Sequence, residues 1–69
     1  MKYAVVIERA DGNYSAYVPD LPGCIATGKT VEETARLIRE AIVFHIDGLR
    51  EEDLPVPEPT THCEYIDAA

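Results

Sequence analysis

The stretch Pro19–Glu33, PDLPGCIATGKTVEE, contains the signals that decide how this chain folds. Within it, Gly23–Thr30 (GCIATGKT) matches the phosphate-loop pattern of nucleotide-binding proteins letter for letter. A phosphate loop needs a buried strand before its first glycine and a flexible glycine-rich loop, whereas here Gly23 follows PDLP and the letters CIAT are strand-like. We therefore interpret the stretch as a turn, a short strand and a helix start, with Lys29 as a solvated turn residue.

The helix start is the best-specified point of the chain. Thr30 suits the N-cap position, and Glu33 lies three residues later, which is the spacing of a capping box. The helix is predicted to run from Val31 to about Asp47, with Gly48 as its C-terminal stop.

The predicted helix carries more apolar surface than one sheet covers, because a second patch lies beside its main apolar stripe. A C-terminal segment or a curled sheet could cover this patch, or it is a subunit or partner surface. A chain of 69 residues builds only one domain with a small core, so we expect a homo-oligomer, either a dimer or a tetramer. The candidate oligomer interface consists of Tyr17, Leu37, Ala41 and Phe44.

The segments around the helix predict an α+β fold in the order β-β-β-α-β. Tyr3–Ala10 and Tyr14–Val18 are rich in β-branched and aromatic residues, and DGN between them is a hairpin turn. Cys24–Thr27 is the third strand, and Thr61–Asp67 alternates as a fourth after the extended connector LPVPEP. The first three strands form an antiparallel meander, and a right-handed crossover places the last strand parallel to the first at the sheet edge.

Composition limits the classes of function. Six Lys and Arg face thirteen Asp and Glu, a formal charge of −7, so most of the surface repels a nucleic-acid backbone and attracts a basic protein. Nothing resembles a signal peptide or a membrane span, so we expect a cytoplasmic protein whose Cys24 and Cys63 are reduced and buried. The cysteines and the two histidines lack metal-ligand spacing, and we predict no metal, no cofactor and no enzymatic activity.

The stretch around Pro19–Glu33 resembles the HicB-like antitoxin family, whose pattern is a strand, P-D-L-P-G-C, a short strand, G-x-T and a helix opening with E-E or E-A. The likeness covers nearly the whole chain, as a single domain over residues 1–69. Lys29 departs from it, since relatives often carry an acidic residue there, and we expect none of the C-terminal DNA-binding domains that many relatives have. The matching residues are Pro19, Asp20, Leu21, Pro22, Gly23, Cys24, Gly28, Thr30 and Glu33.

The resemblance implies a partial ribonuclease-H-like fold without nuclease activity. It also implies a role in binding and neutralising a small HicA-type toxin that cleaves mRNA. Acidic residues beside the connector and on the last strand are the candidate partner contacts: Glu51, Glu52, Asp53, Glu58, Glu64 and Asp67.

Two other hypotheses remain open. One is an orphan interaction protein of the same fold, homo-oligomeric and without a toxin partner. The other is a metal-dependent nuclease using Glu8, Asp20 and Glu64, which requires these carboxylates to converge on one metal. Against it, Asp20 is expected to hydrogen-bond the backbone of its own proline-rich turn.

Overall fold

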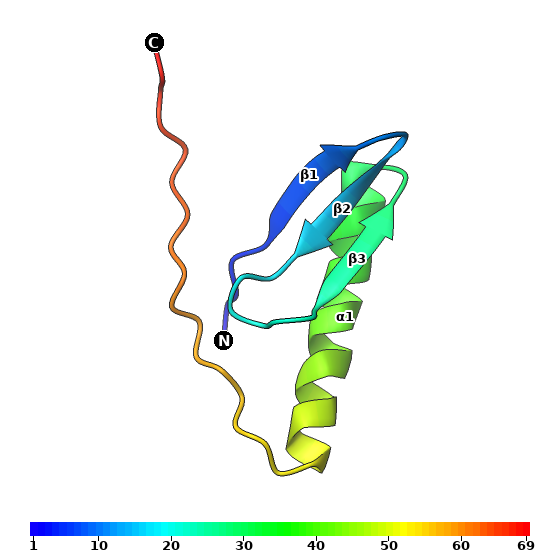
Figure 1. Ribbon diagram of the computed structural model, residues 1–69, viewed down its shortest axis with the longest axis vertical. Coiled ribbons are helices and arrows are strands. Elements are labelled where there is room, and N and C mark those ends of the chain that lie inside the picture. Colours follow the sequence, from blue (N-terminus) through cyan, green and yellow to red (C-terminus); the bar gives the residue numbers. More distant parts are fainter.

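A three-stranded antiparallel sheet and one long helix make up the body of the protein, and a C-terminal segment runs beside them (Figure 1). The computed structural model describes all residues, 1–69. The sheet order is β1-β2-β3, so β1 and β3 are its two edges. This confirms the predicted meander followed by a helix. The elements are β1 Val6–Ala10, β2 Asn13–Tyr17, β3 Ile25–Gly28 and α1 Val31–Glu51.

Two glycine turns set the path of the meander. Gly12, at φ 79°, closes the hairpin between β1 and β2, and Gly23, at φ 84°, turns the chain into β3. Both angles favour glycine because a Cβ would be strained there. Between β2 and β3, backbone bonds from Val18 N–H to Cys24 O (3.3 Å) and from Leu21 N–H to Val18 O (3.0 Å) close the proline-rich loop. The loop thereby inserts Leu21, which is fully buried, beneath the helix.

The strand register divides the sheet into two faces. Ala16 is buried toward α1, and its neighbour Tyr17 therefore points to the opposite face. There Tyr17 lies in register between Val6 of β1 and Ile25 of β3. This apolar row crosses all three strands on the face that no other element covers (Figure 1).

The core is small and lies off-centre. The helix packs mainly on β3 and β2 and only lightly on β1. Burial raises the pKa of the Cys24 thiol, because its thiolate would lose hydration there. Cys24 is thus the small buried hydrophobe that the sequence predicted. The buried hydrophobic residues are Ala16, Val18, Leu21, Cys24 and Ile38.

The start of α1 confirms the predicted cap. Thr30 is the N-cap, and its hydroxyl oxygen accepts from the Glu33 N–H at 3.0 Å. The Glu33 carboxylate reaches one residue further back than in a reciprocal capping box, and accepts from the Lys29 N–H at 3.1 Å. Gly28 lies so close to the helix that a Cβ there would stand 2.6 Å from Thr34 Oγ1. The tight junction between β3 and α1 therefore requires glycine at this position.

The end of α1 lies further along the chain than predicted, so the assignment of Gly48 as the stop is wrong. Gly48 is helical, and the helix continues to Glu51. Asp53 adopts the left-handed φ of 56°. Its N–H bonds to Arg50 O at 3.1 Å, and Leu54 N–H bonds to Leu49 O at 2.9 Å. This is a Schellman ending, with an aspartate at the position that glycine usually occupies.

The predicted fourth strand, Thr61–Asp67, is absent from the single chain. Residues 54–69 carry no helix or strand. They run from the end of α1 back along the molecule, on the same side as β1 but clear of it (Figure 1). A strand needs a hydrogen-bonding neighbour, and residues 62–69 have none within the chain.

Candidate functional site

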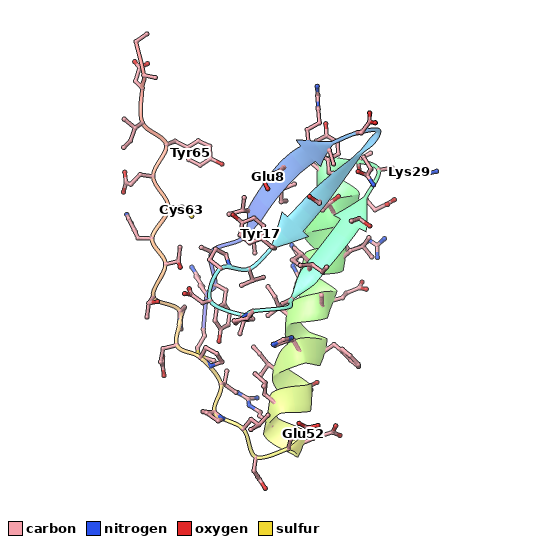
Figure 2. The ribbon with its side chains drawn as sticks, in the orientation of Figure 1. Glu8, Tyr17, Lys29, Glu52, Cys63 and Tyr65 are labelled. Carbon is pink, nitrogen blue, oxygen red and sulfur yellow. The ribbon has the colours of Figure 1, made fainter.

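Three consecutive acidic residues, Glu51, Glu52 and Asp53, form an exposed cluster where α1 ends. Arg50 is the one basic residue of the last helical turn. The C-terminal end of a helix carries a partial negative charge, so each carboxylate here is unfavourable by about 0.3–1 kcal/mol. Helix stability therefore gives no reason for this cluster. Figure 2 shows Glu52 at the tip of the molecule.

The backbone at Asp53 adds to this electrostatic cost. Asp53 is the only residue other than glycine with positive φ in the chain. The left-handed region costs an L-residue about 1–2 kcal/mol, less for Asp and Asn, whose side chains bond locally. Glycine would avoid the strain, so both the backbone and the helix dipole disfavour the aspartate found at this position. Strain of this kind is often associated with function.

A second feature is the anchor that holds the C-terminal segment to the body. Asp20 accepts four hydrogen bonds from two consecutive residues, one from the backbone N–H and one from the hydroxyl of each of Thr60 and Thr61, at 2.9–3.1 Å. These bonds, the Thr61 N–H first, lower the pKa of the Asp20 carboxyl because they favour its charged form. The expectation that Asp20 bonds its own proline-rich turn is therefore wrong.

No local sequence pattern indicates this anchor, because its partners lie 40 and 41 residues away from Asp20. A further bond was missed for the same reason: the Tyr3 hydroxyl donates to Pro57 O at 2.6 Å. We call the segment that follows the anchor, residues 62–69, the tail.

The tail presents apolar and charged groups to solvent. Tyr65 and Ile66 are 101% and 81% exposed. The Glu64 carboxylate lies within hydrogen-bonding distance of His62 Nε2, and Asp67 accepts only from the nearby Ala69 N–H. Cys63 is exposed, which corrects the expectation that both cysteines are buried. Its burial was predicted together with a fourth strand that the single chain does not form.

The residues of the predicted oligomer interface do not share one surface. Tyr17 is partly exposed on the open face of the sheet, whereas Phe44 is 81% exposed on α1, which covers the other face. Leu37 is half-buried, and Ala41 packs against the core. These four residues therefore do not form one continuous patch on a single chain. The oligomer interface stays a prediction, with Tyr17 and Phe44 as separate candidates.

The acidic residues proposed as partner contacts also divide into groups. Glu51, Glu52 and Asp53 lie together at the end of α1. Glu64 lies far along the tail, whose Tyr65 and the helix end at Glu52 stand at opposite ends of the molecule in Figure 2. Glu58, in the connector, is exposed.

The structure holds no group of three or more His, Cys, Asp or Glu side chains placed to bind a metal ion. The three carboxylates of the nuclease hypothesis do not converge on one point. Asp20 binds the two threonines, Glu64 pairs with His62, and Glu8 lies on β1. No helix combines the length and apolar character that a membrane crossing needs.

Comparison with known proteins supplies a family. The family described as "HicB-like antitoxin of bacterial toxin-antitoxin system" matches residues 3–69. An uncharacterized 14.9 kDa protein of Haemophilus phage HP1 is 39% identical over 66 residues, which cover 96% of this chain and 50% of that protein. A UPF0150 protein of Thermoplasma acidophilum is 43% identical over 58 residues, covering 83% of this chain and 84% of that protein.

Antitoxin HicB 2 of Photorhabdus laumondii is 30% identical over 64 residues, covering 93% of this chain and 46% of that protein. This chain therefore spans about half the length of the phage protein and of the antitoxin. Among solved structures, a chain of the HicA3 and HicB3 toxin-antitoxin complex superposes with a TM-score of 0.75 and 30% identity, covering 87% of this chain and 70% of that chain.

Proposed function

This chain belongs to the HicB-like antitoxin family, and we propose that it neutralises a small, basic HicA-type toxin by binding it. The observation that carries the proposal is the acidic cluster Glu51–Asp53, which the helix end holds in place against its own electrostatic and backbone preferences. The solved relative is a HicA3 and HicB3 complex, which supports a toxin of this type as the partner.

The charge of the chain fits such a partner. A toxin that cleaves mRNA must attract phosphate, so its working surface is basic. A net charge of −7 on 69 residues steers a basic protein toward this one, and a rigid acidic cluster gives the encounter a preferred orientation. Glu58, Glu64 and Asp67 would extend the acidic surface along the connector and the tail.

Affinity needs apolar anchors as well as charge. The open face of the sheet offers the row Val6, Tyr17 and Ile25, of which Ile25 is 69% exposed. Phe44 on α1 is the other exposed aromatic residue of the body, on the far side. Tyr17 and Phe44 therefore mark two candidate anchor surfaces. One would bind the toxin, and the other would bind a second copy of this chain.

We assign no catalytic role to this chain. Family membership supports a regulatory, non-enzymatic protein. The carboxylate best placed to resemble a metal ligand, Asp20, is occupied by four hydrogen bonds from Thr60 and Thr61. A cytoplasmic location follows from the proposed toxin partner.

The decisive experiment takes the protein encoded by the neighbouring reading frame as the candidate toxin. Reversing Glu51, Glu52 and Asp53 to Lys should slow association at low salt about tenfold or more, and should flatten its dependence on salt concentration. Surface plasmon resonance at several ionic strengths measures both effects, and circular dichroism checks that the helix is retained. Growth rescue on co-expression should weaken in parallel.

A matched control changes the net charge equally but elsewhere. Reversing Glu8, Asp11 and Glu40 to Lys alters three exposed positions on β1, the hairpin turn and mid-helix. If both triple variants slow association equally, only total charge matters and the helix-end cluster is not the steering surface. If the wild-type chain forms no complex and the neighbouring protein is not toxic alone, the antitoxin function is refuted and the orphan interaction protein takes its place.

A further inference from the structure

Beside β1 the body carries an unfilled apolar groove. Two adjoining hollows of about 290 and 280 Å³ run between α1 and the N-terminal segment that leads into β1, and both include Tyr3 and Ile42. Val5 and Ile7 line one hollow from the strand side, and Ile46 lines the other from the helix side. The groove exists because α1 sits over β2 and β3 and covers β1 only lightly.

The same side of the molecule has a free sheet edge. β1 pairs only with β2, so its outer edge carries unpaired backbone N–H and C=O groups. A free edge next to an apolar groove is the position that one more strand would occupy. Such a strand would bond β1 through its backbone and place alternate side chains in the groove.

The tail carries apolar side chains that suit this position, and it pairs with no strand of its own chain. Cys63 and Tyr65 share one side of an extended segment, and Figure 2 shows both on the side that faces the sheet. In an extended strand Ile66 would lie on the opposite side from Tyr65 and would extend the apolar row of Val6 on the open face. None of these residues makes a hydrogen bond to the body.

We propose that two copies of this protein exchange tails, so that residues 63–67 of each copy form a strand on β1 of the other and fill its groove. The exchange is reciprocal, which closes the assembly as a twofold dimer with both β1 edges covered. The exchanged tail occupies the position beside β1 that a fourth strand of the same chain would take after a crossover from α1.

The hinge of the tail favours exchange over closure within one chain. Asp20 fixes Thr60 and Thr61, and Tyr3 fixes Pro57, so the connector is anchored at two points. Its three prolines between residues 54 and 59 make it stiff and extended. Beyond these anchors the tail leaves the body clear of its own β1 (Figure 1). A stiff hinge that holds a strand away from its own sheet directs it to the sheet of a neighbour.

The first test uses the full chain without any toxin, so its outcome is independent of the proposed function. Tyr65→Pro removes a backbone donor and the side chain meant for the groove. Ala69→Pro also removes a backbone donor, but beyond the pairing segment and without the loss of an aromatic side chain. Light scattering should give twice 7.6 kDa for the wild type and Ala69→Pro, and 7.6 kDa for Tyr65→Pro. The dissociation constant should rise about 100-fold or more, since each dimer loses two aromatic anchors.

The second test separates exchange from closure. Copies labelled with ¹⁵N and copies labelled with ¹³C are mixed after unfolding and refolded together. Filtered NMR experiments should show contacts between Tyr65 of one copy and Ile7 or Ile42 of the other. Contacts found only within one copy, contacts between the two tails alone, or a tail without contacts would each overturn the proposal. A monomeric wild type at 0.1 mM would overturn it as well.

Discussion

At the start of α1, Thr30 and Glu33 satisfy backbone N–H groups that would otherwise lack partners, and acidic side chains face the positive helix end. At the other end, Glu51–Asp53 face the negative helix end, and Asp53 takes a strained backbone angle. Local interactions favour every residue at the first junction and oppose several at the second. The difference teaches that local interactions stabilise the start of α1, whereas folding alone does not explain the acidic groups at its end.

The strongest test of the well-built junction is Gly28→Ala. Its Cβ would lie 2.6 Å from Thr34 Oγ1 and 3.0 Å from the Thr34 backbone nitrogen. β3 and α1 must then separate, which should lower the free energy of unfolding by about 1–3 kcal/mol. Urea unfolding followed by circular dichroism measures the loss.

A double variant shows whether this contact is the cause. Thr34→Ala removes the hydroxyl and leaves the backbone contact, but it also loses the bond from this hydroxyl to Thr30 O (2.7 Å). The loss in the double variant should therefore be smaller than the sum of the two single losses. Strictly additive losses in the two variants would contradict the steric explanation.

The second prediction removes the cap. Thr30→Ala should cost about 0.5–2 kcal/mol, because the Glu33 N–H loses its acceptor. Thr30→Ser keeps the hydroxyl and should retain most of the stability. An unchanged melting temperature in Thr30→Ala would contradict the capping assignment.

The rejection of a phosphate loop has its own test. If the protein binds Mg-ATP with micromolar affinity, and Lys29→Ala abolishes this binding, that rejection is contradicted.

The contrast between the two junctions also explains what the sequence could predict. The turn at Gly23, the short β3 strand and the cap at Thr30 are encoded by neighbours within a few residues, and all are found in the structure. The need for glycine at position 28 depends on a helix packing across the strand end, which local pattern does not contain.

The predictions that failed depend on partners distant in sequence or absent from the chain. Gly48 resembles a helix stop, but Asp53 and the proline at position 55 supply the actual ending. Asp20 finds its partners about 40 residues away. Thr61–Asp67 alternates like a strand, and a strand exists only when another strand lies beside it.

The third prediction tests whether Asp53 destabilises the C-terminal end of α1. Asp53→Gly should raise the free energy of unfolding by about 0.5–1 kcal/mol, because glycine takes the left-handed angle without strain and one charge leaves the negative helix end. Asp53→Ala removes the same charge but keeps the strain, so it should not stabilise. Toxin association should slow in both variants. A less stable Asp53→Gly would show that the aspartate contributes to the fold.

The smallest effect on global stability is expected at the Asp20 anchor, because it fixes only the segment that follows α1. Its pKa is lowered by the hydrogen bonds from Thr61 and Thr60, so the anchor is fully formed above the ordinary pKa of about 3.9 and is lost as the pH falls through the lower, folded value. The ¹H–¹⁵N shifts of the Thr60 and Thr61 amides should titrate in this acidic range, while the amides of β2 and α1 stay in place. In Asp20→Ala both acceptor oxygens are gone, so these two amides should already be displaced at pH 7 and should not titrate. Amides of Thr60 and Thr61 that remain unmoved in Asp20→Ala would mean that the connector is held by Tyr3 and Pro57 alone, and the tail would then pivot from an earlier point in the chain.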